Sequence, residues 1–149
     1  MKILAKNKKA YFNYQILETY IAGIVLEGSE VKSVKAGQIN LSDSYATIDQ
    51  NQEIWLINCH IPLYKYAGNV AEYDPTKARN LLLKKSEIKR LIGKIKEQGL
   101  TLVPIKVYNK GGLIKLEFGV GKGKSKIDKR ETIKKRETER KLRRIKQQY

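Results

Sequence analysis

Lysine and arginine are the residues of this chain whose number and spacing could do chemistry, and that chemistry is the binding of a polyanion. Thirteen of the 31 cations lie within residues 121–149 and face only four acids, so this segment carries +9 of the formal net charge of +16. After Gly123 it contains neither glycine nor proline, and it has too few apolar residues to form a core. A cationic tail of this kind predicts binding to nucleic acids or to acidic membranes.

Residues that could perform catalysis or bind a metal are few. Cys59 and His60 are the chain's single cysteine and single histidine, so neither has a second such ligand with which to bind zinc. As neighbours in a strand they point to opposite faces, which argues against a nucleophilic pair. Residues 119–123 lack the GxxxxGK[ST] spacing of a phosphate loop and predict a flexible exit from the last strand. The acids that show no diagnostic pairing are Asp43, Asp49, Glu53 and Asp74. We therefore expect neither enzyme activity nor a metal or cofactor.

Length and composition indicate one small domain followed by the tail. The 120 residues before the tail suffice for one core. The lone cysteine cannot form an internal disulfide, which favours a reducing cytoplasm. Lysines at positions 6, 8 and 9 interrupt the N-terminus too early for a signal peptide, and no apolar run approaches the ~20 residues of a membrane span. We expect a soluble, cytoplasmic protein.

Alternating apolar residues predict strands in both halves of the domain. Residues 14–26 are rich in tyrosine, isoleucine, valine and leucine, which predicts a long bent strand. Residues 45–48 and 54–57 flank an Asp-Gln-Asn-Gln turn and predict a hairpin. Residues 100–108 and 113–120 predict two further strands, the second with one buried face, and a proline in the first predicts an exposed edge or a bulge.

Helical spacing and capping residues predict three helices. Residues 29–37 form the first, with Ser29 as its N-cap and with Lys32 and Lys35 on one stripe. Asp74-Pro75 predicts the start of a second. Residues 86–99 form the third. Its apolar stripe comprises Ile88, Leu91, Ile92 and Ile95.

Together these elements predict a mainly β fold with short helices: a small, closed or partly closed antiparallel barrel over residues 1–122, of which the OB-like barrel is one example. Residues 123–149 form the basic tail. Three glutamates in it precede a cation at i+4, which supports only marginal helicity in water. We expect a tail that is disordered when free and helical against its target.

The cations support nucleic-acid binding in two places, the tail and a domain face with Lys32, Lys35 and the lysines between Lys84 and Lys96. Six aromatic residues could also stack on bases. They are Tyr11, Phe12, Tyr14, Tyr64, Tyr66 and Tyr73.

An ordered set of motifs covers almost the whole length. It includes Gly28-Ser29-Glu30-Val31-Lys32-Ser33, Asn40-Leu41-Ser42-Asp43-Ser44-Tyr45, Thr101-Leu102-Val103-Pro104, Gly121-Lys122-Gly123-Lys124 and Asp128-Lys129-Arg130. The set resembles the bacterial SsrA-binding proteins, also called small protein B. The resemblance implies an OB-like barrel that binds the tRNA-like domain of transfer-messenger RNA. It also implies delivery of that RNA, with elongation factor Tu, to the vacant A site of stalled ribosomes. The tail would lie as a helix in the empty mRNA channel against 16S rRNA. We expect a monomer.

The resemblance also implies the contact residues. RNA-facing candidates are Glu30, Lys32, Ser33, Lys35, Asn40, Leu82, Lys84, Lys122 and Lys124. Candidates for the decoding centre and channel are Asp128, Lys129, Arg130, Arg136 and Ile145. Glu30 has an equal alternative as a first-turn residue that interacts with the helix dipole. Departures from the family pattern are Ile21, Glu72-Tyr73, Lys84, Ile127 and Thr138, and the last two leave charge as the main tail interaction.

Two other functions remain open from the sequence. A general ribosomal protein or RNA chaperone could thread the same tail into rRNA, without preference for a tRNA-like RNA. A nuclease or RNA-modifying enzyme would need a carboxylate cluster or nucleophile that the sequence does not offer.

Overall fold

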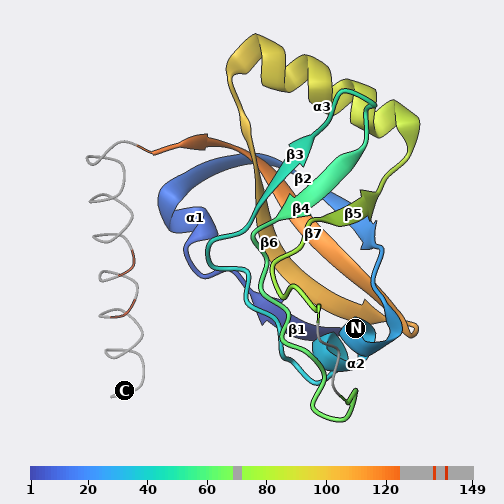
Figure 1. Ribbon diagram of the computed structural model, residues 1–149. Helices are drawn as coiled ribbons and strands as arrows, with labels where there is room; N and C mark the ends of the chain where they lie inside the picture. The colour runs from blue at the N-terminus through green and yellow to red at the C-terminus, as the bar shows by residue number, and fades with distance from the viewer. Residues whose placement is uncertain (69–71, 125–135, 137–139, 141–149) are drawn as a thin grey trace.

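Antiparallel strands form a sheet that closes on itself, with a helix at each end (Figure 1). The computed structural model describes residues 1–68, 72–124, 136 and 140. Its elements are β1 (Lys2–Lys6), α1 (Ala10–Asn13), β2 (Tyr14–Ile24), α2 (Gly28–Lys35), β3 (Tyr45–Ile48), β4 (Ile54–Ile57), β5 (Arg79–Leu82), α3 (Lys85–Gln98), β6 (Thr101–Lys110) and β7 (Leu113–Gly123).

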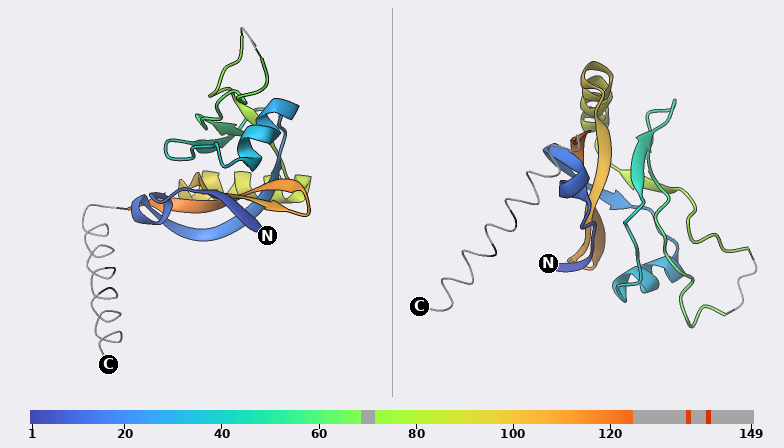
Figure 2. Two further views of the ribbon diagram at one scale, coloured as in Figure 1. Left: turned by 90° about the horizontal axis from the view of Figure 1, so that it is seen from below. Right: turned by 90° about the vertical axis from the view of Figure 1, so that its left-hand side faces the viewer.

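The strand order is β1-β6-β3-β4-β5-β2-β7, and β7 also pairs with β6, so six strands complete a ring. The ring is uneven. β7 pairs with β2 and with β6 over long stretches, whereas β3 meets β6 only at Ala46 and Leu102. Figure 2 shows the result as two facing walls, β2, β6 and β7 on one side and β3, β4 and β5 on the other. The prediction of an OB-like antiparallel barrel with short helices is confirmed.

The core fills the space between the two walls. Ile114, Leu116, Phe118 and Val120 point inward from β7 as their alternation predicted, and all four are buried. Leu91 of α3 covers one end of this core. Burial of an apolar side chain of this size contributes about 1.5–3 kcal/mol, so both the strands and the end helices are held by the same core.

Close backbone approach shapes the β2–β7 contact. A Cβ on Gly119 would lie 2.7 Å from Cγ2 of Ile16 and 3.1 Å from Cδ1 of Ile105. The β6–β7 register shifts between Pro104 and Lys106, which confirms the predicted bulge. Beyond this bulge β6 leaves β3 and pairs with β1 instead.

Several predicted boundaries were wrong. Asp74-Pro75 does not start a helix: Asp74 Oδ1 accepts hydrogen bonds from the N–H and Oγ1 of Thr76, which closes a turn. The apolar residues after it form β5, because this short run completes the ring between β4 and β2. The N-cap of α2 is Glu27 and not Ser29.

The chain's two ends also differ from expectation. The sequence did not predict β1 or α1, which add a small second cluster of Ala10, Val103 and Ile105. The expected flexible exit at residues 119–123 is part of β7, whose Gly123 pairs with Tyr14. Of the predicted tail, residues 123–149, the structure describes Gly123, Lys124, Arg136 and Arg140, so the predicted tail behaviour falls on residues outside the described part.

Candidate nucleic-acid interface

Helix α2 is attached to the barrel by an ion pair between Glu30 and Arg79. Arg79 Nη2 lies 2.7 Å from Glu30 Oε2, and both side chains are 1% exposed. The other carboxylate oxygen accepts a hydrogen bond from the N–H of Glu27 at 3.0 Å and completes a capping box. Because removal of either partner would leave a buried charge, the pair fixes α2 relative to β5.

The same contacts keep the Glu30 carboxylate ionised. Burial alone would raise the pKa of Glu30. The hydrogen bond from Glu27 N–H, the hydrogen bond and charge of Arg79, and the charge of Lys77 outweigh this effect and lower the pKa below its ordinary value. Glu30 therefore serves α2 as a charged internal anchor.

Arg79 also holds the loop between β4 and β5 at both of its ends. Its Nη1 donates to the carbonyl oxygen of Cys59 at 2.7 Å, and its Nη2 donates to that of Pro75 at 3.0 Å. From the helix, Ser33 Oγ donates to the carbonyl oxygen of Pro62 at 2.9 Å. Both ends of the loop are thus held against α2.

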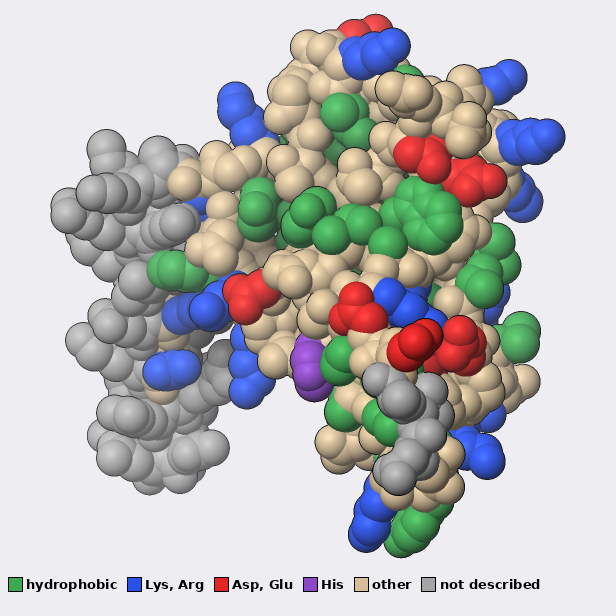
Figure 3. Space-filling model, viewed as in Figure 1, with side chains coloured by type: hydrophobic (Ala, Val, Ile, Leu, Met, Phe, Trp, Pro, Cys, Tyr) green, Lys and Arg blue, Asp and Glu red, His purple; other side chains and the backbone are tan. Residues whose placement is uncertain are grey.

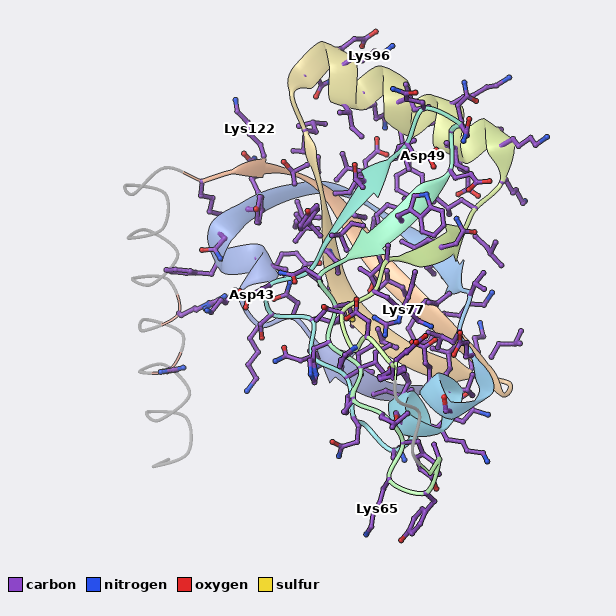
Figure 4. All side chains as sticks on the ribbon, viewed as in Figure 1. Asp43, Asp49, Lys65, Lys77, Lys96 and Lys122 are labelled. Carbon is purple, nitrogen blue, oxygen red and sulfur yellow. The ribbon has the colours of Figure 1, made fainter. Side chains whose placement is uncertain are left out.

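Two tyrosines and two lysines lie together on this loop and helix. Lys32 Nζ is 5.7 Å from the ring centroid of Tyr64, and Tyr64 packs edge-to-face against Tyr66 at 5.5 Å. Lys65 Nζ is 5.1 Å from the Tyr66 centroid, and Tyr66 is 73% exposed. Figure 4 places Lys65 at the outer end of the loop. This tyrosine cluster (Lys32, Tyr64, Lys65 and Tyr66) offers a stacking surface for bases and charge for phosphates.

Leu82 lies on the same side of the barrel. It is 57% exposed and lines a shallow hollow of about 270 Å³ together with Val31 of α2 and Leu113 of the β6–β7 hairpin. Lys84, two residues further on, is exposed. Of these two candidates, Leu82 lines the hollow, which brings the end of β5 next to Val31 of α2.

Lys122 and Lys124 lie elsewhere. Nine residue steps along a strand cover ~30 Å, so Lys122 is far from Leu113 at the other end of β7; Figure 4 labels Lys122 on the side away from β5. The N–H of Lys124 donates to the carbonyl oxygen of Asn13, and its Nζ donates to that of Tyr11, each at 2.9 Å. The root of the tail is thereby attached to α1.

The remaining candidates have separate positions. Lys35 is exposed in the last turn of α2. Asn40 Oδ1 accepts hydrogen bonds from the N–H and Oγ of Ser42, so this amide shapes the turn before β3. The Arg136 guanidinium lies 6.0 Å from the ring centroid of Phe12. Outside the described residues are Asp128, Lys129, Arg130 and Ile145.

Apart from one patch among acidic side chains below the centre, the cations of the face shown in Figure 3 lie at its margins, at the α3 end, beside α1 and beyond α2. A band of hydrophobic side chains crosses the middle of that face. On the β3–β4 strands, Tyr45 is 48% exposed, and Trp55 and Ile57 are half-buried. Charge and apolar surface therefore alternate across the barrel.

Within the described part of the chain, no three acids, histidines or cysteines gather as a metal site would require. Cys59 is buried, and its burial raises the pKa of the thiol to about 11, whereas His60 is exposed. None of the described helices is long and apolar enough to cross a bilayer.

Comparison with known proteins decides the family. The family model described as "SmpB protein" matches residues 4–148. The chain belongs to the SmpB family. A protein named SsrA-binding protein from Thermosipho africanus is 55% identical over 143 residues, covering 95% of each chain. One of the same name from Trichodesmium erythraeum is 49% identical over 148 residues, covering 99% of this chain and 94% of that protein.

A solved structure presented as "tmRNA-SmpB: a journey to the center of the bacterial ribosome" contains a chain similar to this one. The TM-score is 0.66 and the identity 43%, covering 82% of this chain and 85% of the other. The SmpB family consists of RNA-binding proteins and not of enzymes, so the expectation of a non-enzyme is confirmed by membership.

Two residues of this region, Lys65 on its surface and Arg79 beneath it, were not predicted from the sequence. Lys65 stands between two tyrosines that were considered for stacking, and this interleaving could have indicated it. Nothing in the sequence around Arg79 indicated its role, because its partner Glu30 lies 49 positions earlier in the chain.

Proposed function

We propose that this chain is an RNA-binding adaptor that binds the tRNA-like domain of transfer-messenger RNA and delivers it to stalled ribosomes in trans-translation. The observation that carries the proposal is the surface over α2, where the exposed tyrosine cluster and the Leu82 hollow lie above a rigid buried ion pair. The names of the relatives and the subject of the similar solved structure support it.

Within this proposal the candidates on α2 and β5 have two roles. Lys32, Lys35 and Lys84 are exposed and contact phosphates. Glu30 and Ser33 are 1% exposed, so they act from beneath by holding α2 and its loop in position.

The remaining candidates likewise divide into residues that contact RNA and a residue that holds the backbone in position. Leu82 offers apolar contact to the RNA, and Asn40 fixes the turn that follows α2. Lys122 and Lys124 form a second contact region at the tail root.

For the tail we propose a role on the ribosome. Residues 123–149 form a segment distinct from the barrel of residues 1–122, and it becomes helical in an mRNA channel that holds no message. There Asp128, Lys129, Arg130, Arg136 and Ile145 contact the decoding centre and 16S rRNA. The adaptor acts as a monomer in the cytoplasm and enters the A site with elongation factor Tu.

The test compares the full chain with a chain ending at Lys124, which keeps the contacts of Lys124 with α1. Both are titrated with the tRNA-like domain at physiological salt, with bulk tRNA as competitor, and both are assayed for alanine tagging on stalled ribosomes. We expect selective binding by both chains and tagging by the full chain alone. Binding that disappears with the tail, or that bulk tRNA abolishes equally, would instead favour a general RNA-binding protein.

A further inference from the structure

Two hollows lie side by side between α3 and the β3–β4 hairpin, at the end of the barrel away from α2 (Figure 1). One has a volume of about 500 Å³, with Ile92, Ile95 and Lys96 on the α3 side. The other has about 650 Å³, with Lys85 and Lys89 on that side. Gln52 lines both, so they form one groove along α3 that the hairpin turn partly divides.

The α3 edge of the groove carries a row of three lysines. At 3.6 residues per turn, Lys85, Lys89 and Lys96 lie within about 40° of one another around the helix and span ~16 Å along it. All three are exposed, and within the described chain none forms an ion pair, whereas Lys94 on the opposite side of α3 pairs with Glu18. Figure 4 labels Lys96 on α3 and Asp49 on the facing hairpin. The row is therefore free to bind an anionic backbone.

The hairpin edge is rigid and presents polar side chains. Asp49 Oδ1 accepts hydrogen bonds from the N–H groups of Asn51 and Glu53, and Oδ2 accepts one from Trp55 Nε1, all at 2.9 Å. Gln52 adopts a φ of 60°, a left-handed conformation that a closed turn imposes on a side-chain-bearing residue. The turn thus fixes the backbone from which the exposed side chains of Gln52 and Glu53 line the groove.

Aliphatic side chains form the floor. In the first hollow they come from Leu100 and Leu102, which are buried, and from Ile92 and Ile95, which are half-buried. The groove therefore has cations along one edge, amides and carboxylates along the other, and an apolar surface between them. Single-stranded nucleic acid is complementary to this arrangement: its phosphates match the cations, the flat faces of its bases match the apolar surface, and the polar edges of the bases match the amides and carboxylates.

We propose that this groove binds single-stranded RNA, with the phosphates along Lys85, Lys89 and Lys96 and the base edges toward the hairpin. Each hollow has the size of a small-ligand pocket and holds one nucleotide. Because Glu53 accepts hydrogen bonds but cannot donate them, bases with an exocyclic amino group, such as cytosine, bind better than uracil. The proposal rests on the proposed RNA-binding function and adds a site on the α3 side of Leu82, a residue that lines both this groove and the hollow beside α2.

The experiment uses site-specific photocrosslinking on the full chain. Asn51→Cys places an exposed thiol on the hairpin for a photoreactive azidophenacyl label, while the buried Cys59 thiol stays unlabelled. Thr19→Cys, exposed on the other wall, is the control position. The probes are fluorescent ten-nucleotide oligocytidine and oligouridine. We expect a crosslink from position 51, stronger with oligocytidine, and a background yield from position 19.

A charge-matched comparison then tests the lysine row in the Asn51→Cys background. Replacing Lys85, Lys89 and Lys96 with Gln removes three phosphate contacts. The dependence of log crosslink yield on log salt should therefore become shallower by about 2, at a slope of about 0.7 per contact. Replacement of Lys2, Lys8 and Lys110 with Gln removes the same charge from exposed positions elsewhere and should leave that slope unchanged.

Each outcome is decisive. Equal crosslinking from positions 51 and 19, or equal effects of the two triple replacements, would overturn the groove proposal. The tRNA-like domain is titrated in parallel. If that binding is intact while the groove result is negative, only the groove proposal fails; if the wild-type chain binds neither RNA, the proposed function fails with it.

Discussion

Arg79 and Glu30, 49 positions apart in the chain, form a hydrogen-bonded ion pair inside the protein: Nε and Nη2 of the arginine both lie 2.7 Å from Oε2 of the glutamate. The pair joins β5 to α2 directly beneath the proposed RNA surface. Rigid placement of α2 therefore depends on a buried contact, and the first two predictions follow from it.

Arg79→Met should strongly destabilise the fold, because it leaves the Glu30 carboxylate buried without its partner. We expect a loss of about 3–5 kcal/mol in the free energy of unfolding, measured by urea denaturation. Lys77→Met is the matched control: Lys77 Nζ lies 3.5 Å from Glu30 but is partly exposed, so its loss should cost less than about 1 kcal/mol. Equal losses for the two variants would show that the buried pair is not the anchor.

The same pair predicts an acid-dependent stability. The pKa of Glu30 is lowered from its ordinary value of 4.5, so below that value the unfolded chain binds more protons than the folded one. The stability contributed by Glu30 is present above pH 4.5 and is lost as the pH falls through the lower folded value. Glu30→Gln should be less stable than wild type at neutral pH, and this difference should shrink below pH 4.5 in urea titrations between pH 6 and 3. A constant difference across that range would contradict the lowered pKa.

Gly119→Ala should destabilise the barrel by overpacking. The added methyl group would lie 2.7 Å from Cγ2 of Ile16 on β2 and 3.1 Å from Cδ1 of Ile105 on β6, so it would meet side chains from both neighbouring strands. Overpacking in such a site costs about 1–3 kcal/mol, which thermal or urea unfolding would measure. Gly123→Ala in the same strand is the control, since nothing lies within 4 Å of its added methyl group. A neutral Gly119→Ala would mean that the wall adjusts more easily than its packing indicates.

Tyr66→Ala should weaken binding to the tRNA-like domain without affecting the fold, because the ring is largely exposed. Loss of one stacked base costs about 1–3 kcal/mol, or ~5- to 150-fold in Kd, measured by fluorescence anisotropy. Tyr66→Phe keeps the ring and should bind like wild type. Tyr45→Ala, which removes a half-exposed ring from β3, controls for general loss of aromatic surface. If Tyr66→Ala binds as tightly as wild type, the tyrosine cluster is not part of the interface.

Local patterns predicted much of the barrel correctly. The alternation in β7, the turn between β3 and β4 and the apolar stripe of α3 each depend on neighbours within a few residues, which is why the sequence alone indicated them. The helix predicted at Asp74-Pro75 was wrong for the same reason, because this pair fits a helix start and a turn equally well. The strand that follows it forms because β5 completes the sheet between β4 and β2.

The sequence by itself determined the charge, the core-forming alternation and, through its ordered motifs, the family to which this chain belongs. It could not determine which side chains share a surface. Leu82 and Val31 line one hollow, and Lys96 faces a hairpin formed more than forty residues earlier, only because the ring closes through long-range strand pairs. The role of Glu30 was likewise decided by tertiary structure, since a carboxylate in a first helical turn becomes a buried anchor only when Arg79 is brought against it. Local periodicity is fixed by covalent geometry, whereas surface neighbours are fixed by how the sheet closes.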